Sequence, residues 1–253
     1  MTAAPAETHE DAPSYDRSRA ARVWYSLVRW LSVIWLCATG GLRASGRENL
    51  PATGGALLVS NHVSFLDVFV LGIPLNRPLN YVARSTLFLP VLGPFLHSIG
   101  AFPIQREGMG ASGLKETLRR LRRGGVVLLF PEGTRSPDGR LAPIKSGIAV
   151  IARKAKVPVV PAAVAGTFEA WPRDQLFPSW LAVRVHYGPA ILPAELAGLG
   201  AEAVTGLIQE RIADCQREAA SALARGLGVE PILAPDQTAS VRKTPLGGRP
   251  DFE

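Results

Sequence analysis

A histidine and an aspartate stand five positions apart directly after a short apolar run. His62 and Asp67 belong to the segment Asn61-His62-Val63-Ser64-Phe65-Leu66-Asp67. A carboxylate can fix the tautomer of an imidazole, whose other nitrogen can then take a proton as a general base. On a regular helix this separation turns the two side chains about 140° apart, so the pair meets only in an irregular segment. Ser64 offers that irregularity, because Ser64-x-x-Asp67 is also a helix-capping pattern, and a simple cap remains the alternative.

Three further segments place polar residues at the ends of apolar runs. Arg106 follows one run, and Gly166 with Thr167 follows another. Between them comes the turn Pro131-Glu132-Gly133-Thr134-Arg135-Ser136. Proline and glycine favour a turn, Glu132 can hold a hydroxyl, and Arg135 can grip a phosphate with its planar fork. Taken singly, each segment also has a structural explanation as a solvated charge, a bare turn or a packed strand.

The apolar runs predict a mainly parallel sheet. Most are continuously hydrophobic, as in strands that are buried on both faces. We expect strands at Ala56–Ser60, Asn80–Ala83, Ala101–Gln105, Val126–Phe130, Val157–Val164 and Leu181–Tyr187, and helices at Leu66–Leu71, Gly113–Arg123, Gly147–Lys154 and Glu202–Arg225. The predicted fold class is α/β, with one domain over residues 45–230. Ligands bind beyond the C-terminal ends of parallel strands, so one cleft would gather the polar segments.

Residues 20–44 predict a helical segment at a membrane interface. Arg22 and Arg29 are set among Trp24, Tyr25, Trp30 and Trp35. The apolar stretch after Arg29 is short against the roughly 20 residues that a bilayer span needs. Indole rings favour the headgroup boundary, and arginines can reach lipid phosphates. A helix that covers the domain's own core is the alternative. We expect a disordered leader over residues 1–19 and a flexible tail over residues 231–253.

The composition favours anionic partners. Lys and Arg number 28 against 21 Asp and Glu, a net charge of +7, which suits lipid headgroups, phosphorylated substrates or nucleic acid. Hydrophobic residues make up 47% of the chain, slightly many for a soluble protein but too few for a multi-span membrane protein. Cys37 and Cys215 lie far apart, so neither a disulfide framework nor a CxxC metal site is predicted.

Taken together and in this order, the four segments resemble the glycerophospholipid acyltransferase family, which includes 1-acylglycerol-3-phosphate acyltransferases. The likeness is closest at Asn61-His62-x-Ser64-x-x-Asp67, which carries an HX4D motif, and at Phe130–Ser136. It is looser at Gly100–Arg106 and Val157–Pro161, and it covers about residues 45–190. Arg84 stands where family members often have lysine.

The resemblance implies an O-acyltransferase of phospholipid biosynthesis. It implies His62 and Asp67 as the catalytic pair, with His62 as the general base towards a hydroxyl that attacks an acyl thioester. The implied substrate-binding residues are Arg106, Glu132, Gly133, Thr134 and Arg135. The two arginines would bind the acceptor's phosphate, and Glu132 would contact its glycerol portion or orient an arginine.

The same resemblance implies the partners and the location of the protein. The expected acceptor is the sn-2 hydroxyl of lysophosphatidate, with glycerol 3-phosphate or another lysolipid as alternatives. The expected donor is acyl-CoA or acyl-ACP, and no cofactor, metal or nucleic acid is expected. The protein would sit on an anionic membrane surface at the cytoplasmic face, as a peripheral or monotopic protein.

Two other function classes remain open. Gly108-Met109-Gly110-Ala111-Ser112-Gly113 matches G-x-G-x-x-G between a strand and a helix, with Glu132 about 20 residues farther on, as in dinucleotide-binding proteins. However, Arg106 and Glu107 separate the expected strand from the first glycine. The other class is a non-catalytic lipid-binding protein. The expected helix Gly113–Arg123 has a leucine stripe with basic residues elsewhere, which fits a solvated face or a face towards anionic lipid.

Overall fold

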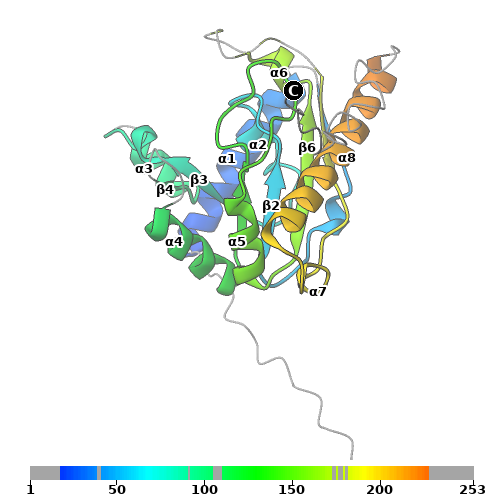
Figure 1. Cartoon of the computed structure of the whole chain (residues 1–253). Coiled ribbons are helices and arrows are strands. Elements are labelled where there is room, and N and C mark those ends of the chain that lie inside the picture. Colours follow the sequence, from blue (N-terminus) through cyan, green and yellow to red (C-terminus); the bar gives the residue numbers. More distant parts are fainter. Residues whose placement is uncertain are drawn as a thin grey trace, which may run out of the picture.

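A seven-stranded sheet with helices on both faces forms the centre of the molecule (Figure 1). The computed structural model describes residues 18–38, 41–90, 92–104, 110–172, 175, 179 and 182–227. The strands lie in the order β1-β7-β6-β2-β5-β3-β4. β6 and β7 pair antiparallel, and every other neighbouring pair is parallel. The predicted α/β fold with a mainly parallel sheet is therefore confirmed.

The strands are β1 (Leu42–Ser45), β2 (Ala56–Ser60), β3 (Leu79–Arg84), β4 (Phe102–Ile104), β5 (Val126–Leu129), β6 (Val159–Ala165) and β7 (Val183–Tyr187). The helices of the described ranges are α1 (Arg19–Ala38), α2 (Asp67–Val70), α3 (Leu92–Ser98), α4 (Gly110–Arg122), α5 (Gly147–Ala155), α6 (Thr167–Ala170), α7 (Pro193–Leu196) and α8 (Ala201–Leu227). Two 3₁₀ turns, η1 (Arg47–Asn49) and η2 (Ser85–Leu87), follow β1 and β3.

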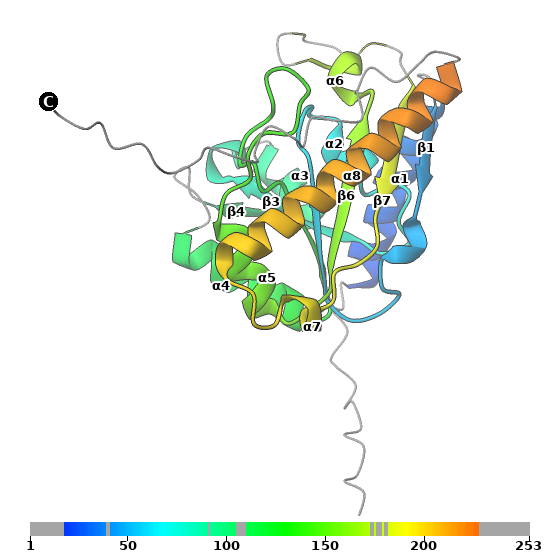
Figure 2. The same cartoon turned by 45° about the vertical axis from the view of Figure 1, so that its right-hand side comes forward.

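Successive side chains of the central strands point to opposite faces of the sheet and pack in two separate hydrophobic cores. On one face, Leu57 and Val59 of β2 join residues of α4, α5 and α8. On the other face, Leu58 packs in a cluster that includes α2 and is covered by Tyr25 and Val28 of α1. Figures 1 and 2 show this arrangement, with α1 behind the sheet and α5 and α8 in front of it. The sheet is thus buried on both sides, which explains why its central strands read as continuous apolar runs.

The N-terminal part of the chain differs from its predicted boundaries. The helix ends at Ala38, and Leu42–Ser45 is a strand that pairs in parallel with β7. The sheet therefore starts inside the segment expected to be helical up to residue 44. Arg43 and Ser45 are exposed while Leu42 and Ala44 are partly buried, so β1 is a half-buried edge strand that only its pairing reveals. The expected leader lies almost wholly outside the described residues, and the expected tail does so entirely.

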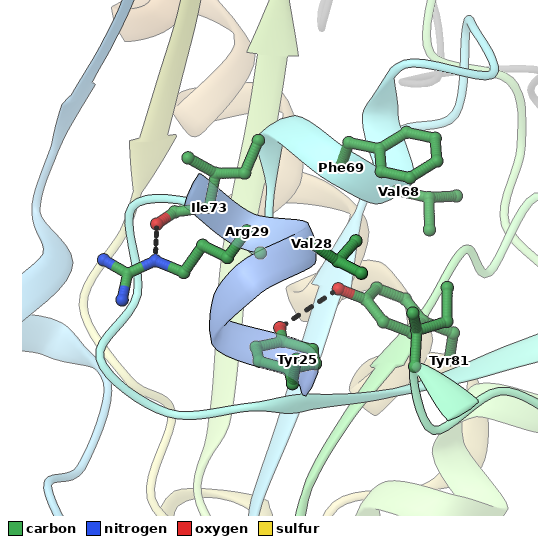
Figure 3. Close-up of a pocket in the computed structure, with 9 residues that line it drawn as sticks. Tyr25, Val28, Arg29, Val68, Phe69, Ile73 and Tyr81 are labelled. Carbon is green, nitrogen blue, oxygen red and sulfur yellow. Dashed lines mark hydrogen bonds between the residues drawn. The ribbon is translucent and has the colours of Figure 1, made fainter. Parts of the chain in front are cut away.

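Helix α1 is docked on the domain along one side only. Arg29 Nε donates to the carbonyl oxygen of Ile73 at 2.7 Å, and the hydroxyls of Tyr25 and Tyr81 lie 3.4 Å apart (Figure 3). Val28 packs beside them, next to a mainly apolar cavity whose wall includes Val68 and Phe69 of α2. The other side of α1 exposes five large apolar side chains to between 49% and 69%: Val23, Leu27, Trp30, Leu31 and Ile34.

Helix α1 therefore has two different sides, and each corresponds to one of the two roles considered for it from the sequence. The inner side covers the core, as the alternative in the sequence suggested, and the outer side carries the apolar residues that an interfacial helix needs. Among the helices of the described residues, none is long and apolar enough to cross a membrane.

Candidate active site

The polar segments meet at the C-terminal ends of three neighbouring parallel strands. β2 ends next to His62, while β5 and β6, which flank β2, end next to the Pro131–Ser136 turn and Thr167. Asn61 ties two of these ends together, because its fully buried side-chain amide donates to the carbonyl oxygen and accepts from the N–H of Val164 at 3.2 and 2.9 Å. The polar segments thus gather at one edge of the sheet, as its topology leads one to expect.

His62 and Asp67 are in direct contact. His62 Nδ1 lies 2.8 Å from Asp67 Oδ2, and the same oxygen accepts the backbone N–H groups of Val63 and Ser64 at 2.7 and 2.8 Å. The segment is not helical before Asp67, which lets residues five apart meet. Asp67 therefore does both things that the sequence left open. Its carboxylate holds the start of the turn as a cap does, and it orients the imidazole.

The orientation of His62 leaves its second nitrogen on the accessible side. The imidazole stacks on Phe130, with ring centroids 4.0 Å apart and planes inclined by 16°. Asp67 is fully buried, while the side chain of His62 is 18% exposed. A carboxylate acceptor at Nδ1 favours the tautomer with a proton there, so Nε2 carries the lone pair. The pair has the geometry of a general base held ready for a hydroxyl.

Glu132 points inwards instead of into the cleft. Its Oε1 accepts the backbone N–H of His62 at 2.7 Å, and its Oε2 accepts the backbone N–H of Ala142 at 2.9 Å. The side chain is buried, and this burial raises the pKa of Glu132 to about 7, although the two N–H bonds act to lower it. Glu132 therefore supports the backbone at His62 through these bonds, whereas the sequence suggested that it contacts the acceptor's glycerol portion or orients an arginine.

The turn that contains Glu132 makes a second backbone hydrogen bond to His62 and has positively charged side chains next to it. The N–H of Ser136 donates to the carbonyl oxygen of His62 at 2.7 Å. Gly133 has a φ of 75°, a backbone conformation that favours glycine, and Lys145 Nζ lies 2.7 Å from where a Cβ would stand. The carbonyl oxygen of Gly133 accepts from Arg84 Nη2 at 3.0 Å. Two cations therefore flank Gly133, and Arg135 follows two residues later.

Arg135 lies against an aromatic ring from the neighbouring turn. Its Cζ is 3.6 Å from the ring centroid of Phe65, a residue of the His62–Asp67 segment. Phe65 in turn packs against Trp171, with centroids 5.7 Å apart. Nothing in the sequence pattern pointed to Phe65, because single exposed aromatic residues are common on protein surfaces.

The remaining predicted residues lie at this edge or outside the described ranges. Thr134 is exposed beside Gly133, and Thr167 is fully buried after β6. Arg106 lies outside the described residues, as do the first two residues of the G-x-G-x-x-G match. The acid that a nucleotide would need in that match is Glu132, whose two oxygens already accept backbone N–H groups. The site geometry therefore weighs against the dinucleotide-binding alternative.

Comparison with known proteins points the same way. The family model described as Acyltransferase matches residues 41–165. The 1-acyl-sn-glycerol-3-phosphate acyltransferase of Bacillus subtilis is 38% identical over 133 residues, which cover 52% of this chain and 66% of that protein. The chloroplastic 1-acyl-sn-glycerol-3-phosphate acyltransferase BAT2 of Brassica napus is 39% identical over 131 residues, 50% of this chain and 38% of that protein.

A solved structure extends the comparison to most of the fold. The 1-acyl-sn-glycerophosphate acyltransferase PlsC of Thermotoga maritima superposes with a TM-score of 0.66 at 22% identity, over 81% of this chain and 83% of that one. This likeness shows a shared fold. The segment that matches the acyltransferase family model, residues 41–165, contains His62, Asp67 and the Pro131–Ser136 turn.

Proposed function

We propose that this chain moves a fatty acyl group from an acyl thioester to the sn-2 hydroxyl of lysophosphatidate, which yields phosphatidate. The observation that carries the proposal is the 2.8 Å contact of His62 with buried Asp67 at the edge of the sheet. The names of the relatives in Bacillus subtilis and Brassica napus support the acceptor. This chain spans only 66% and 38% of the lengths of these two relatives, so the identity of the acceptor is proposed here together with the reaction.

The geometry suggests one sequence of bond changes. Nε2 of His62 takes the proton of the acceptor hydroxyl while the oxygen attacks the thioester carbonyl carbon. Asp67 stabilises the imidazolium that forms. When the tetrahedral intermediate collapses, the C–S bond breaks and the departing thiolate receives the proton from His62. The products are the ester and a free thiol, and His62 returns to its starting tautomer.

The charged residues around the Gly133 turn supply a place for the acceptor's phosphate. Arg135 and Arg84 come from the ends of β5 and β3, and Lys145 lies beside them. Arg106 would join this group, as the sequence suggested, together with Gly133 and Thr134. A guanidinium can bind a phosphate through two parallel N–H bonds, which fixes the acceptor relative to His62.

Stabilisation of the oxyanion must come from donors that are not already in use. The backbone N–H groups of His62, Val63, Ser64, Gly133 and Ser136 all donate within the protein. These are the backbone N–H groups next to His62 and Gly133 that would be expected to donate to the oxyanion. The donor therefore has to be sought elsewhere at the cleft, or has to be released when substrate binds.

A membrane surface is the proposed place of action. The exposed apolar side chains of α1 suit the boundary between headgroups and acyl chains, where a lysophosphatidate acceptor resides. A peripheral or monotopic attachment at the cytoplasmic face agrees with these features.

A donor-by-acceptor activity matrix tests the proposal. Purified protein in detergent would be assayed with acyl-CoA and acyl-ACP against lysophosphatidate, glycerol 3-phosphate, a neutral monoacylglycerol and other lysolipids. We expect the highest rate with lysophosphatidate, and a rate lower by about 10²–10⁴-fold for a folded His62→Ala variant. Absence of transfer to every acceptor would leave a lipid-binding role, and near-normal rates for His62→Ala would exclude the mechanism.

A further inference from the structure

The aromatic ring of Phe65 contacts one side chain from each of the two neighbouring strand ends of the site. Trp171 follows β6, Phe65 follows β2, and Arg135 follows β5, which is the order of these strands in the sheet. Phe65 contacts both Trp171 and the guanidinium of Arg135. The hydroxyl of Ser64 donates to the carbonyl oxygen of Trp171 at 2.9 Å, and this bond links the segment after β2 to the segment after β6.

Phe65 is unusual within its own segment. Its neighbours Ser64 and Leu66 are buried, whereas the ring of Phe65 is 45% exposed. It also lies three residues from His62, at the side of the turn that faces the Pro131–Ser136 turn. The ring is therefore placed where it can contact Arg135 without contributing to the hydrophobic core.

The chemistry of the contact decides what the ring can do. A guanidinium within about 6 Å of a ring centroid is attracted by the negative face of the ring. A carboxylate in the same place would also hold Arg135, but it would neutralise the charge and occupy N–H donors. The phenyl ring restrains the guanidinium without adding a negative charge beside it.

We propose that Phe65 is the positioning residue that holds Arg135 for the phosphate of the acceptor. This inference rests on the proposed function, in which Arg135 binds that phosphate. Phe65 would act on the binding of phosphate-bearing acceptors through Arg135, and it would have little effect on the transfer step at His62.

The first test compares Phe65→Leu with Phe65→Trp. Leucine keeps an apolar side chain but has no π face, whereas tryptophan has a stronger one. For lysophosphatidate we expect Phe65→Leu to raise KM by roughly 2- to 30-fold with kcat nearly unchanged, and Phe65→Trp to restore KM. For a neutral monoacylglycerol acceptor, Phe65→Leu should leave the rate unchanged. An equal loss with both acceptors would overturn the proposal, because it would indicate a packing defect.

The second test weakens the negative electrostatic potential of the Phe65 ring face while the shape of the side chain stays nearly the same. Site-specific replacement of Phe65 by mono-, di- and trifluorinated phenylalanine should raise KM for lysophosphatidate step by step, because each fluorine weakens the negative face. The same series at Phe88, whose ring packs on His97 at 4.8 Å between centroids, is the matched control and should leave KM constant. A flat series at Phe65 would overturn the proposal.

Arg135→Ala separates the inference from the proposed function. If Arg135→Ala leaves KM for lysophosphatidate unchanged, the proposed phosphate contact itself is wrong. If Arg135→Ala raises KM but the fluorinated series is flat, only the role of Phe65 is wrong. If Arg135→Ala raises KM and the fluorinated series also raises it step by step, both the phosphate contact and the role of Phe65 are supported. Phe65→Leu should then cause no further increase of KM in the Arg135→Ala background, because the guanidinium that Phe65 positions is gone.

Discussion

At the scale of single residues, His62 and Asp67 contribute differently to proton transfer. We expect His62→Ala to lower kcat by about 10²–10⁴-fold, because the base itself is removed. In Asp67→Asn the amide oxygen can still accept from Val63, Ser64 and His62, so the tautomer of His62 is kept while the negative charge is lost. Acyl-transfer kinetics should therefore show a smaller drop in kcat for Asp67→Asn than for His62→Ala.

The stability of the two variants supplies the control. Asp67 Oδ1 is buried without a hydrogen-bond partner among the described residues, so an amide nitrogen in its place would be an unsatisfied donor. We expect Asp67→Asn to lower the free energy of unfolding by about 1–3 kcal/mol and His62→Ala to change it less. A larger loss of kcat in Asp67→Asn than in His62→Ala would contradict the assignment of His62 as the base.

Glu132 is the residue whose role changed most between sequence and structure. Its carboxylate offers two acceptor oxygens to two backbone N–H groups, from His62 and Ala142. In Glu132→Gln one of those N–H groups must face an NH₂ group. We predict a loss of about 1–3 kcal/mol in the free energy of unfolding and a lower kcat with little change in KM, measured by chemical denaturation and steady-state kinetics. A raised KM at constant kcat would instead indicate direct contact with substrate.

The raised pKa of Glu132 adds a pH dependence with a definite sign. Because the pKa of Glu132 is about 7 in the folded protein, against 4.5 for an unperturbed glutamate, the folded state holds the proton more tightly. The stability that this group contributes is complete below pH 4.5 and is lost as the pH rises towards 7, by at most about 3 kcal/mol. Denaturation curves of wild type and Glu132→Gln should converge or cross over this range. Parallel curves would show that Glu132 is not shifted.

The candidate site shows what local sequence can and cannot predict. The contact of His62 with Asp67 was predictable, because both residues sit in one short segment whose irregular start Ser64 signals. The inward turn of Glu132 was not, because its partners His62 and Ala142 lie 70 and 10 residues away and become neighbours only in the fold. Phe65 was missed for the same reason, since its significance depends on Arg135 from another strand end.

At the scale of elements, the same distinction separates predicted from missed strands. β2 and β5 are buried on both faces, so their own residues identify them. β1 has the sequence Leu-Arg-Ala-Ser and becomes a strand only through its pairing with β7. The Leu92–Ser98 helix contains Gly93 and Pro94, which usually discourage helices, and it was also missed. The nearby docking of Trp24 on Ser98 offers one tertiary contact that favours it.

One side of helix α1 is not covered by any of the described residues, and its exposed apolar side chains can be tested directly. We predict that Trp30→Glu, Leu31→Glu and Ile34→Glu together lower binding to phospholipid vesicles at least about 10-fold. Burial of even one large apolar side chain is worth about 1.5–3 kcal/mol, and glutamate preserves the helix. Vesicle sedimentation measures the effect.

The control for α1 adds the same charge elsewhere. Ala201→Glu, Ala203→Glu and Gly206→Glu lie at exposed positions of α8 and should leave vesicle binding within about twofold if charge alone is not the cause. Full vesicle binding by the α1 variant would show that this helix is not the attachment site. An equal loss in both variants would mean that net charge governs binding.

At the scale of the whole molecule, the layer order decides which cations can face a bilayer. α1 covers one face of the sheet, and α4 packs with α5 and α8 on the opposite face. The two helical layers are two packing distances apart, about 20 Å, whereas electrostatic attraction to a surface decays over about 8 Å at physiological salt. If α1 lies on the membrane, the exposed basic residues of α4 point away from it. The fold therefore favours the solvated-face interpretation of that helix.

This conclusion predicts the result of removing the α4 charges. Lys115→Gln, Arg122→Gln and Arg123→Gln together should leave binding to anionic vesicles within about twofold at physiological ionic strength, whereas a single Arg19→Gln exchange at the start of α1 should weaken it roughly fivefold, as expected for about 1 kcal/mol per basic residue near the surface. Arg119 and Arg120 stay in place because they pair with Glu116. A loss of 10-fold or more in the α4 variant, with Arg19→Gln unaffected, would mean that the molecule meets the lipid with the α4 side and that the apolar side of α1 has another partner.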